Sequence, residues 1–131
     1  KSPLGPYGDF VMQTDDSVGR ILAALERLGL AKDTLVILTS DNGCAVQAGV
    51  EKFEAQGHFA SARFRGYKGD IWEGGHRVPL VVRWPDRVQA GTSSPQMVCL
   101  TDLFATCAGV VGADRLDPPL LGREHNPIQL L

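Results

Sequence analysis

Residues 33–43 have the sequence Asp-Thr-Leu-Val-Ile-Leu-Thr-Ser-Asp-Asn-Gly, in which four consecutive aliphatic residues lead directly into a polar cluster. A continuous aliphatic run of this length is typical of a strand buried on both faces, as in parallel sheets flanked by helices. In open α/β sheets, ligands bind beyond the carboxyl ends of the strands. The stretch therefore predicts a buried strand at residues 35–38, with a ligand site directly after it.

The residues before this strand have a helical pattern. Between positions 9 and 28, apolar residues recur at steps of three, four and seven, which is the spacing of one buried helix face. Gly29 follows the last apolar position and suits a left-handed helix end. A helix, a tight turn and a buried strand form the αβ half of a βαβ unit, so the sequence predicts an α/β fold.

The rest of the chain is less regular. Residues 44–70 show no firm period and predict a long loop, and loops of that length in compact domains are often functional. Residues 78–85 predict a short strand closed by a Pro-Asp turn, and residues 100–111 predict a second amphipathic helix.

Composition and charge exclude two classes of partner. The 131 residues carry 13 basic and 15 acidic side chains, giving a net charge of −2 without a basic block, which argues against nucleic acid. No apolar run approaches the roughly 18 residues of a membrane span. Cys44, Cys99 and Cys107 lack metal-ligand spacing and are expected to be buried free thiols, with a Cys99–Cys107 disulfide left open. Oligomeric state leaves no trace in the sequence.

Three sets of polar residues are candidates for chemistry. Asp41 and Asn42 offer two hard oxygen ligands of the kind that Ca²⁺ or Mg²⁺ prefers over Zn²⁺. The alternative for this pair is an Asx turn. Lys68, flanked by glycines, can approach an anion closely, the alternative being a solvated surface lysine. His58 lies within the predicted loop and is a candidate for substrate contact.

Several motifs, taken in order, resemble the type I sulfatases, or arylsulfatases, of the alkaline phosphatase superfamily. The resemblance runs from about residue 7 to 112, and residues 113–131 depart from the family pattern. The matching segments are residues 7–22, residues 33–43, Arg65-Gly66-Tyr67-Lys68, Trp72-Glu73-Gly74-Gly75-His76-Arg77-Val78-Pro79 and Arg83-Trp84-Pro85.

The resemblance implies a role for each candidate. Asp41 and Asn42 match the second half of the family's calcium site, and Lys68 matches the catalytic lysine that contacts the sulfate group. A substrate contact by His58 is a further expectation. Residues 1–112 would be a partial catalytic domain of the alkaline-phosphatase-like fold, with a mainly parallel sheet flanked by helices, incomplete here, and residues 113–131 an irregular tail.

The intact parent is expected to hydrolyse sulfate esters of sugars or aryl alcohols with a calcium ion. In this family the nucleophile is a formylglycine made from the cysteine of a C-x-P-S-R or C-x-A-x-R motif, and none of the three cysteines lies in such a motif. The chain lacks a start methionine and a signal region, so the nucleophile is expected in a missing amino-terminal part. Family members suggest a periplasmic, lysosomal or secreted location.

Two other functions are compatible with the same residues. One is a phosphoester or phosphonate hydrolase of the same superfamily, because sulfate and phosphate are both tetrahedral oxyanions. Zinc-dependent relatives tend to place histidine directly after the metal aspartate, and Asn42 in that position favours calcium and sulfate. The other is a non-catalytic remnant that binds sulfated glycans.

The isolated 131-residue chain is predicted to be inactive as an enzyme. Ca²⁺ takes roughly six to eight oxygen ligands, and Asp41 with Asn42 supply only part of that set. The chain also lacks the nucleophile needed for a covalent route. We expect no release of product from an aryl sulfate, with or without added Ca²⁺, and measurable turnover by this chain alone would contradict the prediction.

Overall fold

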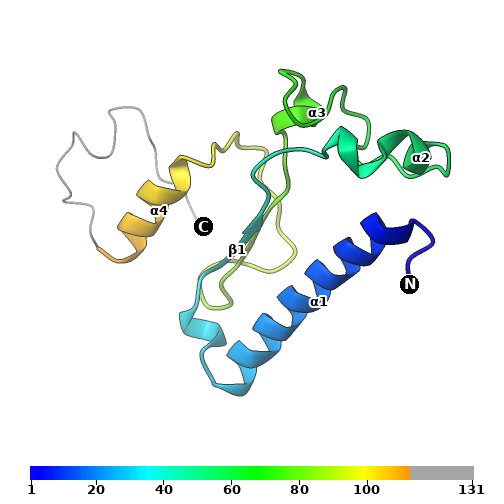
Figure 1. Ribbon diagram of the computed structural model, residues 1–131. Helices are drawn as coiled ribbons and strands as arrows, with labels where there is room; N and C mark the ends of the chain where they lie inside the picture. The colour runs from blue at the N-terminus through cyan, green and yellow to red at the C-terminus, as the bar shows by residue number, and fades with distance from the viewer. Residues whose placement is uncertain (113–131) are drawn as a thin grey trace. The chain divides into compact units, whose positions relative to one another are not determined.

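The computed structural model describes residues 1–112, which divide into two compact units, Lys1–Pro85 and a second one that begins at Asp86. The tail expected at 113–131 lies outside the described residues. The described part of the second unit contains helix α4 (Asp102–Val110). The first unit contains, in order, helix α1 (Gly5–Arg27), the 3₁₀ turn η1 (Ala31–Asp33), strand β1 (Val36–Thr39), the 3₁₀ turn η2 (Val46–Ala48), helix α2 (Val50–Glu54), the single-turn helix α3 (Glu73–His76) and strand β2 (Leu80–Arg83) (Figure 1).

Helix α1 confirms the predicted helix and begins earlier than expected, at Gly5. Pro6 lies in its first turn, where the missing N–H costs no hydrogen bond and the fixed φ suits the helix. At the other end Gly29 has φ +69°, and its N–H donates to the Glu26 carbonyl at 3.0 Å. The N–H of Leu30 donates to the Leu25 carbonyl at 2.9 Å. These two bonds form a Schellman motif, which pairs carbonyls that the last turn would otherwise leave open.

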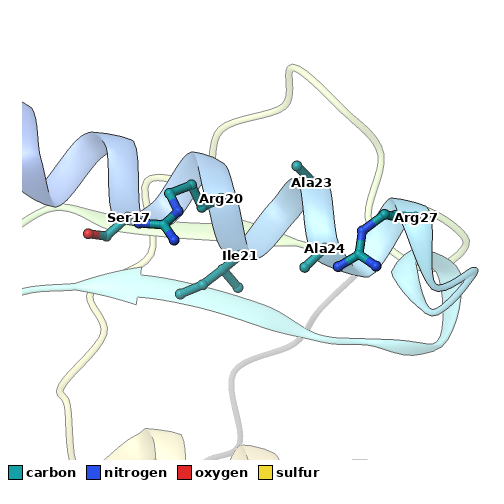
Figure 2. Close-up of a pocket in the computed structure, with 6 residues that line it drawn as sticks. All are labelled: Ser17, Arg20, Ile21, Ala23, Ala24 and Arg27. Carbon is teal, nitrogen blue, oxygen red and sulfur yellow. The ribbon is translucent and has the colours of Figure 1, made fainter.

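The apolar face of α1 is only partly covered within residues 1–112. Val18, Leu22 and Leu25 are half-buried, whereas Phe10 and Ile21 are 68% and 58% exposed. A pocket lies along this helix, and Figure 2 shows its Ile21 side chain on the side of α1 that faces β1. The pocket is lined by Ser17, Arg20, Ile21, Ala23, Ala24 and Arg27, and therefore contains none of the candidate site residues.

Strands β1 and β2 confirm the two predicted strand segments but pair antiparallel, with Thr39 opposite Leu80. The parallel pairing expected for residues 35–38 is thus not the one that forms here. The chain returns through residues 40–79 to the same end of the sheet at which β1 ends. For a parallel pair, the connection would have to cross to the opposite end of the strands. Leu38 is 42% exposed rather than buried, since the sheet in the described residues has only these two strands.

The antiparallel pairing has a consequence for the site. The carboxyl end of β1 and the amino end of β2 lie at the same end of the sheet, so the residues after Thr39 meet those before Leu80. At the other end of the two strands, the Arg83 guanidinium forms an ion pair with Glu26 at 2.5 Å. The indole N–H of Trp84 donates to the Lys32 carbonyl at 2.9 Å. These contacts hold β2 to α1 and η1.

The segment 44–70, predicted as a loop, contains η2 and α2. Helix α2 has five residues, which is too few to show a helical apolar period, and the sequence therefore gave no signal for it. Val50 and Phe53 of α2 are 3% and 5% exposed and are among the most buried apolar residues of the first unit. The Phe53 ring stacks on Tyr7 with centroids 4.2 Å apart, which ties the amino end of α1 to α2.

Helix α4 of the second unit confirms the predicted second helix. The Asp102 carboxylate accepts a hydrogen bond from the Cys99 N–H at 2.8 Å near the start of this helix. All three cysteines are free thiols, as expected. Cys99 and Cys107 are exposed, whereas both were expected to be buried. In residues 1–112 no helix is long and apolar enough to cross a membrane.

Replacement of Gly29 tests the Schellman motif. A Cβ at Gly29 would contact nothing within 4 Å, so Gly29→Ala acts only through the positive φ. Left-handed backbone costs a non-glycine residue about 1–2 kcal/mol. We expect the free energy of unfolding, measured by urea denaturation, to fall by about 1 kcal/mol.

Gly19→Ala provides the matched control for this substitution. Gly19 lies inside α1, and its Cβ would also meet open space. Alanine is favoured over glycine inside a helix by about 0.5–1 kcal/mol, so this variant should gain stability. Equal effects of the two substitutions would contradict the assignment of Gly29 to the helix end.

Candidate functional site

The polar cluster after β1 presents hard oxygen atoms. The hydroxyl of Ser40 donates to the Asn42 carbonyl at 2.9 Å, and the Asn42 side-chain amide donates its N–H to the Gly43 carbonyl at 3.0 Å. This second bond uses the nitrogen of the amide and not its oxygen. Asp41 is exposed beside it. The pair fits calcium in the chemistry of its donors.

The described residues offer few side chains that could bind a calcium ion. In residues 1–112, no group of three His, Cys, Asp or Glu side chains gathers in a way that could hold a metal ion. That Asp41 and Asn42 form half of a calcium site stays a prediction.

A close backbone contact joins this cluster to α3. The N–H of Gly43 donates to the Gly75 carbonyl at 2.9 Å. A Cβ at Gly43 would lie 1.8 Å from the Gly74 carbonyl oxygen, and a Cβ at Gly74 would lie 2.0 Å from that of Gly66. Real Cβ atoms do not approach other atoms this closely, so only glycine permits the three segments to cross here.

Lys68 is brought to the same place by its backbone. Its N–H donates to the Cys44 carbonyl at 2.9 Å, two residues beyond Asn42. The Gly74 N–H donates to the Arg65 carbonyl at 2.8 Å, which fixes the start of the Lys68 segment against α3. The Lys68 side chain is exposed. The structure thus brings together the segments that carry Asp41, Asn42 and Lys68, while the roles of the side chains remain predictions.

His58 lies in a different set of contacts. Its ring packs edge-on against Phe53, with centroids 6.2 Å apart, and is tilted against Tyr7 at 5.8 Å. The Nε2 atom is buried and has no hydrogen-bond partner among the described residues. His58 is therefore part of an aromatic cluster with Tyr7 and Phe53 and is not joined to Lys68 by the backbone contacts above. Its contact with substrate stays a prediction.

Burial affects two groups next to the site. It raises the pKa of the Cys44 thiol above its ordinary value. Burial also raises the pKa of Tyr7, with a smaller contribution from Cys44. Both shifts favour the neutral form of the group.

Sequence reasoning missed the residues that support Lys68. The Tyr67 hydroxyl donates to the Glu54 carboxylate at 2.6 Å. The hydrogen bond to Glu54 raises the pKa of Tyr67, with smaller contributions from burial and from nearby negative charge. The Arg65 guanidinium lies 4.0 Å above the centroid of the Trp72 ring. No sequence signal identified the first pair, because 13 residues separate Glu54 from Tyr67 without any period.

The crossing of the glycine segments generates a prediction for Gly43→Ala. The new methyl group would collide with the Gly74 carbonyl and separate the cluster after β1 from α3. Overpacking of this kind costs about 1–3 kcal/mol. We expect a fall of that size in the free energy of unfolding by urea. Gly19→Ala adds the same methyl group in open space and is the control, and a Gly43→Ala protein as stable as the control would contradict the contact.

Comparison with known proteins gives a consistent family. Residues 1–113 match the family model described as Sulfatase. Steryl-sulfatase of Mus musculus is 46% identical over 129 residues, which cover 98% of this chain and 20% of the mouse protein. N-acetylgalactosamine-6-sulfatase of Rattus norvegicus is 40% identical over 115 residues, which cover 88% of this chain and 20% of the rat protein. The chain thus spans about a fifth of the length of these relatives.

A solved structure agrees with these relatives. It is a sulfatase described in connection with the metabolism of multiple glycosaminoglycans by Bacteroides thetaiotaomicron, and it superposes with a TM-score of 0.75 at 33% identity. The superposition covers 83% of this chain and 23% of that one. It confirms the α/β fold class. This chain forms part of an alkaline-phosphatase-like fold. The match to the family model over residues 1–113, together with these relatives, shows that the chain belongs to the sulfatase family.

Proposed function

We propose that this chain forms part of the active site of a sulfuric ester hydrolase. The observation that carries the proposal is the hydrogen bond from the Lys68 N–H to the Cys44 carbonyl, directly after Asp41-Asn42-Gly43. This bond joins the segment that carries Lys68 to the segment that follows Asp41 and Asn42, which supports a site shared by a cation and two hard oxygen donors. A divalent cation and an ammonium group side by side suit a tetrahedral dianion or monoanion, such as a sulfate ester group.

Asp41 and Asn42 would hold a calcium ion together with ligands from the rest of the parent protein. The Asp41 carboxylate is exposed, and the Asn42 amide bonds to Gly43 through its nitrogen and not through its oxygen. Calcium would supply charge stabilisation to the sulfate oxygens, and a formylglycine outside this chain would supply the nucleophile. The contribution of this chain is to hold the two oxygen donors in place.

Lys68 would bind the sulfate group and stabilise the charge that develops as the ester bond breaks. At 4 Å and an effective dielectric near 20, its attraction to a unit negative charge is about 4 kcal/mol. Preorganised donors of this type account for about 10²–10³ in rate when one of them is removed. The lysine would therefore act on both the binding of substrate and the rate.

The substrate class is a sulfated small molecule or glycan. The names of the relatives span steryl and N-acetylgalactosamine 6-sulfates, so they support a sulfate ester without choosing its alcohol. Among the other functions considered, a phosphoester hydrolase has no support from the relatives named above, and a glycan-binding remnant is distinguished by the absence of turnover.

Substitution of Lys68 and Asp41 in the complete protein that contains this chain tests the proposal. We expect Lys68→Ala and Asp41→Ala each to lower kcat/KM for an aryl sulfate by about 10²–10³. Removal of calcium with a chelator should abolish turnover, and added Ca²⁺ should restore it in the wild type. Lys52→Ala, an exposed lysine on α2, is the control and should leave turnover unchanged.

The same assay separates the competing functions. Aryl sulfate and aryl phosphate are compared as substrates at equal concentration, and hydrolysis of the sulfate should be the faster. A protein that cleaves only the phosphate would establish the phosphoester hydrolase instead. A protein that binds sulfated glycans without cleaving either ester would establish the non-catalytic remnant.

A further inference from the structure

The position of Lys68 depends on more than its own backbone hydrogen bond. A lysine ammonium is a point charge at the end of a flexible four-carbon stem, so its location depends on how firmly the backbone beneath it is held. One hydrogen bond, from the Lys68 N–H to the Cys44 carbonyl at 2.9 Å, holds this residue itself, and the bond from the Gly74 N–H to the Arg65 carbonyl holds the segment three residues earlier. Further contacts beside Lys68 restrict how far the backbone can shift around these bonds.

Tyr67, the residue before Lys68, supplies a further fixed point through its side chain. Its hydroxyl donates to the Glu54 carboxylate at 2.6 Å, which is the short distance of a charge-assisted O–H···O⁻ bond. Its N–H donates to the Asp70 carboxylate at 2.9 Å, and the Asp70 N–H returns a bond to the Tyr67 carbonyl at 2.9 Å. The bonds to Asp70 close the turn internally, whereas the bond to Glu54 ties it to another element.

Glu54 is a firm partner because α2 is itself anchored. The preceding residue, Phe53, is 5% exposed and stacks on Tyr7 of α1 with centroids 4.2 Å apart. Val50, one turn earlier, is 3% exposed. The carboxylate of Glu54 therefore lies at the end of a helix held by the most buried apolar contacts of the first unit. The raised pKa of Tyr67 agrees with a phenol that donates to this carboxylate.

We propose that the Glu54–Tyr67 hydrogen bond positions Lys68 for the sulfate group, so that both Glu54 and Tyr67 are positioning residues of the sulfatase site. The inference rests on the proposed function. The Glu54–Tyr67 hydrogen bond and the bond to the Cys44 carbonyl together hold the backbone at Lys68 from two sides. One bond comes from α2, and the other comes from the segment that follows β1. The ammonium then meets a sulfate group without first restricting the motion of the whole turn.

Tyr67→Phe in the complete protein removes the hydroxyl and keeps the ring. Inorganic sulfate, as a competitive inhibitor, is the probe of the anion pocket. We expect its Ki to rise about tenfold, with kcat/KM for an aryl sulfate falling by a similar factor, because misplacement of a binding group by about 1 Å can cost up to 10²-fold. A merely structural role would reduce the amount of active enzyme and leave Ki unchanged.

Glu54 provides the second arm of the experiment. Glu54→Ala removes the acceptor and should raise Ki as Tyr67→Phe does, whereas Glu54→Gln keeps an amide oxygen and should hold Ki within about threefold of the wild type. In the double variant Tyr67→Phe/Glu54→Ala, the two effects should not add, since both remove one interaction. If Tyr67→Phe fails to fold, the comparison of Glu54→Ala with Glu54→Gln decides the question.

Tyr7→Phe is the matched control. Tyr7 stacks on Phe53, and its hydroxyl makes no hydrogen bond with other residues in the range 1–112, so loss of this hydroxyl should leave Ki unchanged. An unchanged Ki in Tyr67→Phe and Glu54→Ala, with the wild type active, would overturn the positioning role alone. A wild-type protein that neither cleaves aryl sulfate nor binds sulfate would overturn the proposed function and this inference together.

Discussion

The crossing of backbones at Gly43 and Gly74 is the constraint on which the candidate site depends. Gly43 donates to the Gly75 carbonyl at 2.9 Å, and no side chain larger than hydrogen fits at Gly43 or Gly74. This contact joins residues more than thirty positions apart in the sequence. It brings the oxygen donors of Asp41 and Asn42 next to the segment that carries Lys68.

The antiparallel pairing of β1 and β2 makes this crossing possible. Because Thr39 lies opposite Leu80, the chain leaves one strand and enters the other at the same end of the sheet. The intervening residues 40–79 therefore form one excursion that starts and ends at the site. Helix α2 stabilises this excursion from within, through the stacking of Phe53 on Tyr7 and the hydrogen bond between Glu54 and Tyr67.

Local chemistry was enough to predict several elements of the chain. The periodic apolar residues of α1, the aliphatic run of β1 and the position of Gly29 each act within a few residues, so their structural effect can be recognised from the sequence. Helix α2 could not be predicted, because five residues span less than two helical turns and show no period. The antiparallel pairing of β1 with β2 could not be predicted either, since a buried aliphatic run is compatible with either direction.

By itself, the sequence determined the α/β class, the residues of the two strands and the candidate donors Asp41, Asn42 and Lys68, because residue type and short-range spacing specify these features. Only the tertiary structure decided which segments meet. It showed that Lys68 is bonded to Cys44, that Tyr67 reaches Glu54, and that His58 packs among aromatic rings. Such contacts depend on close backbone approach between residues distant in the chain, and no local pattern encodes that approach.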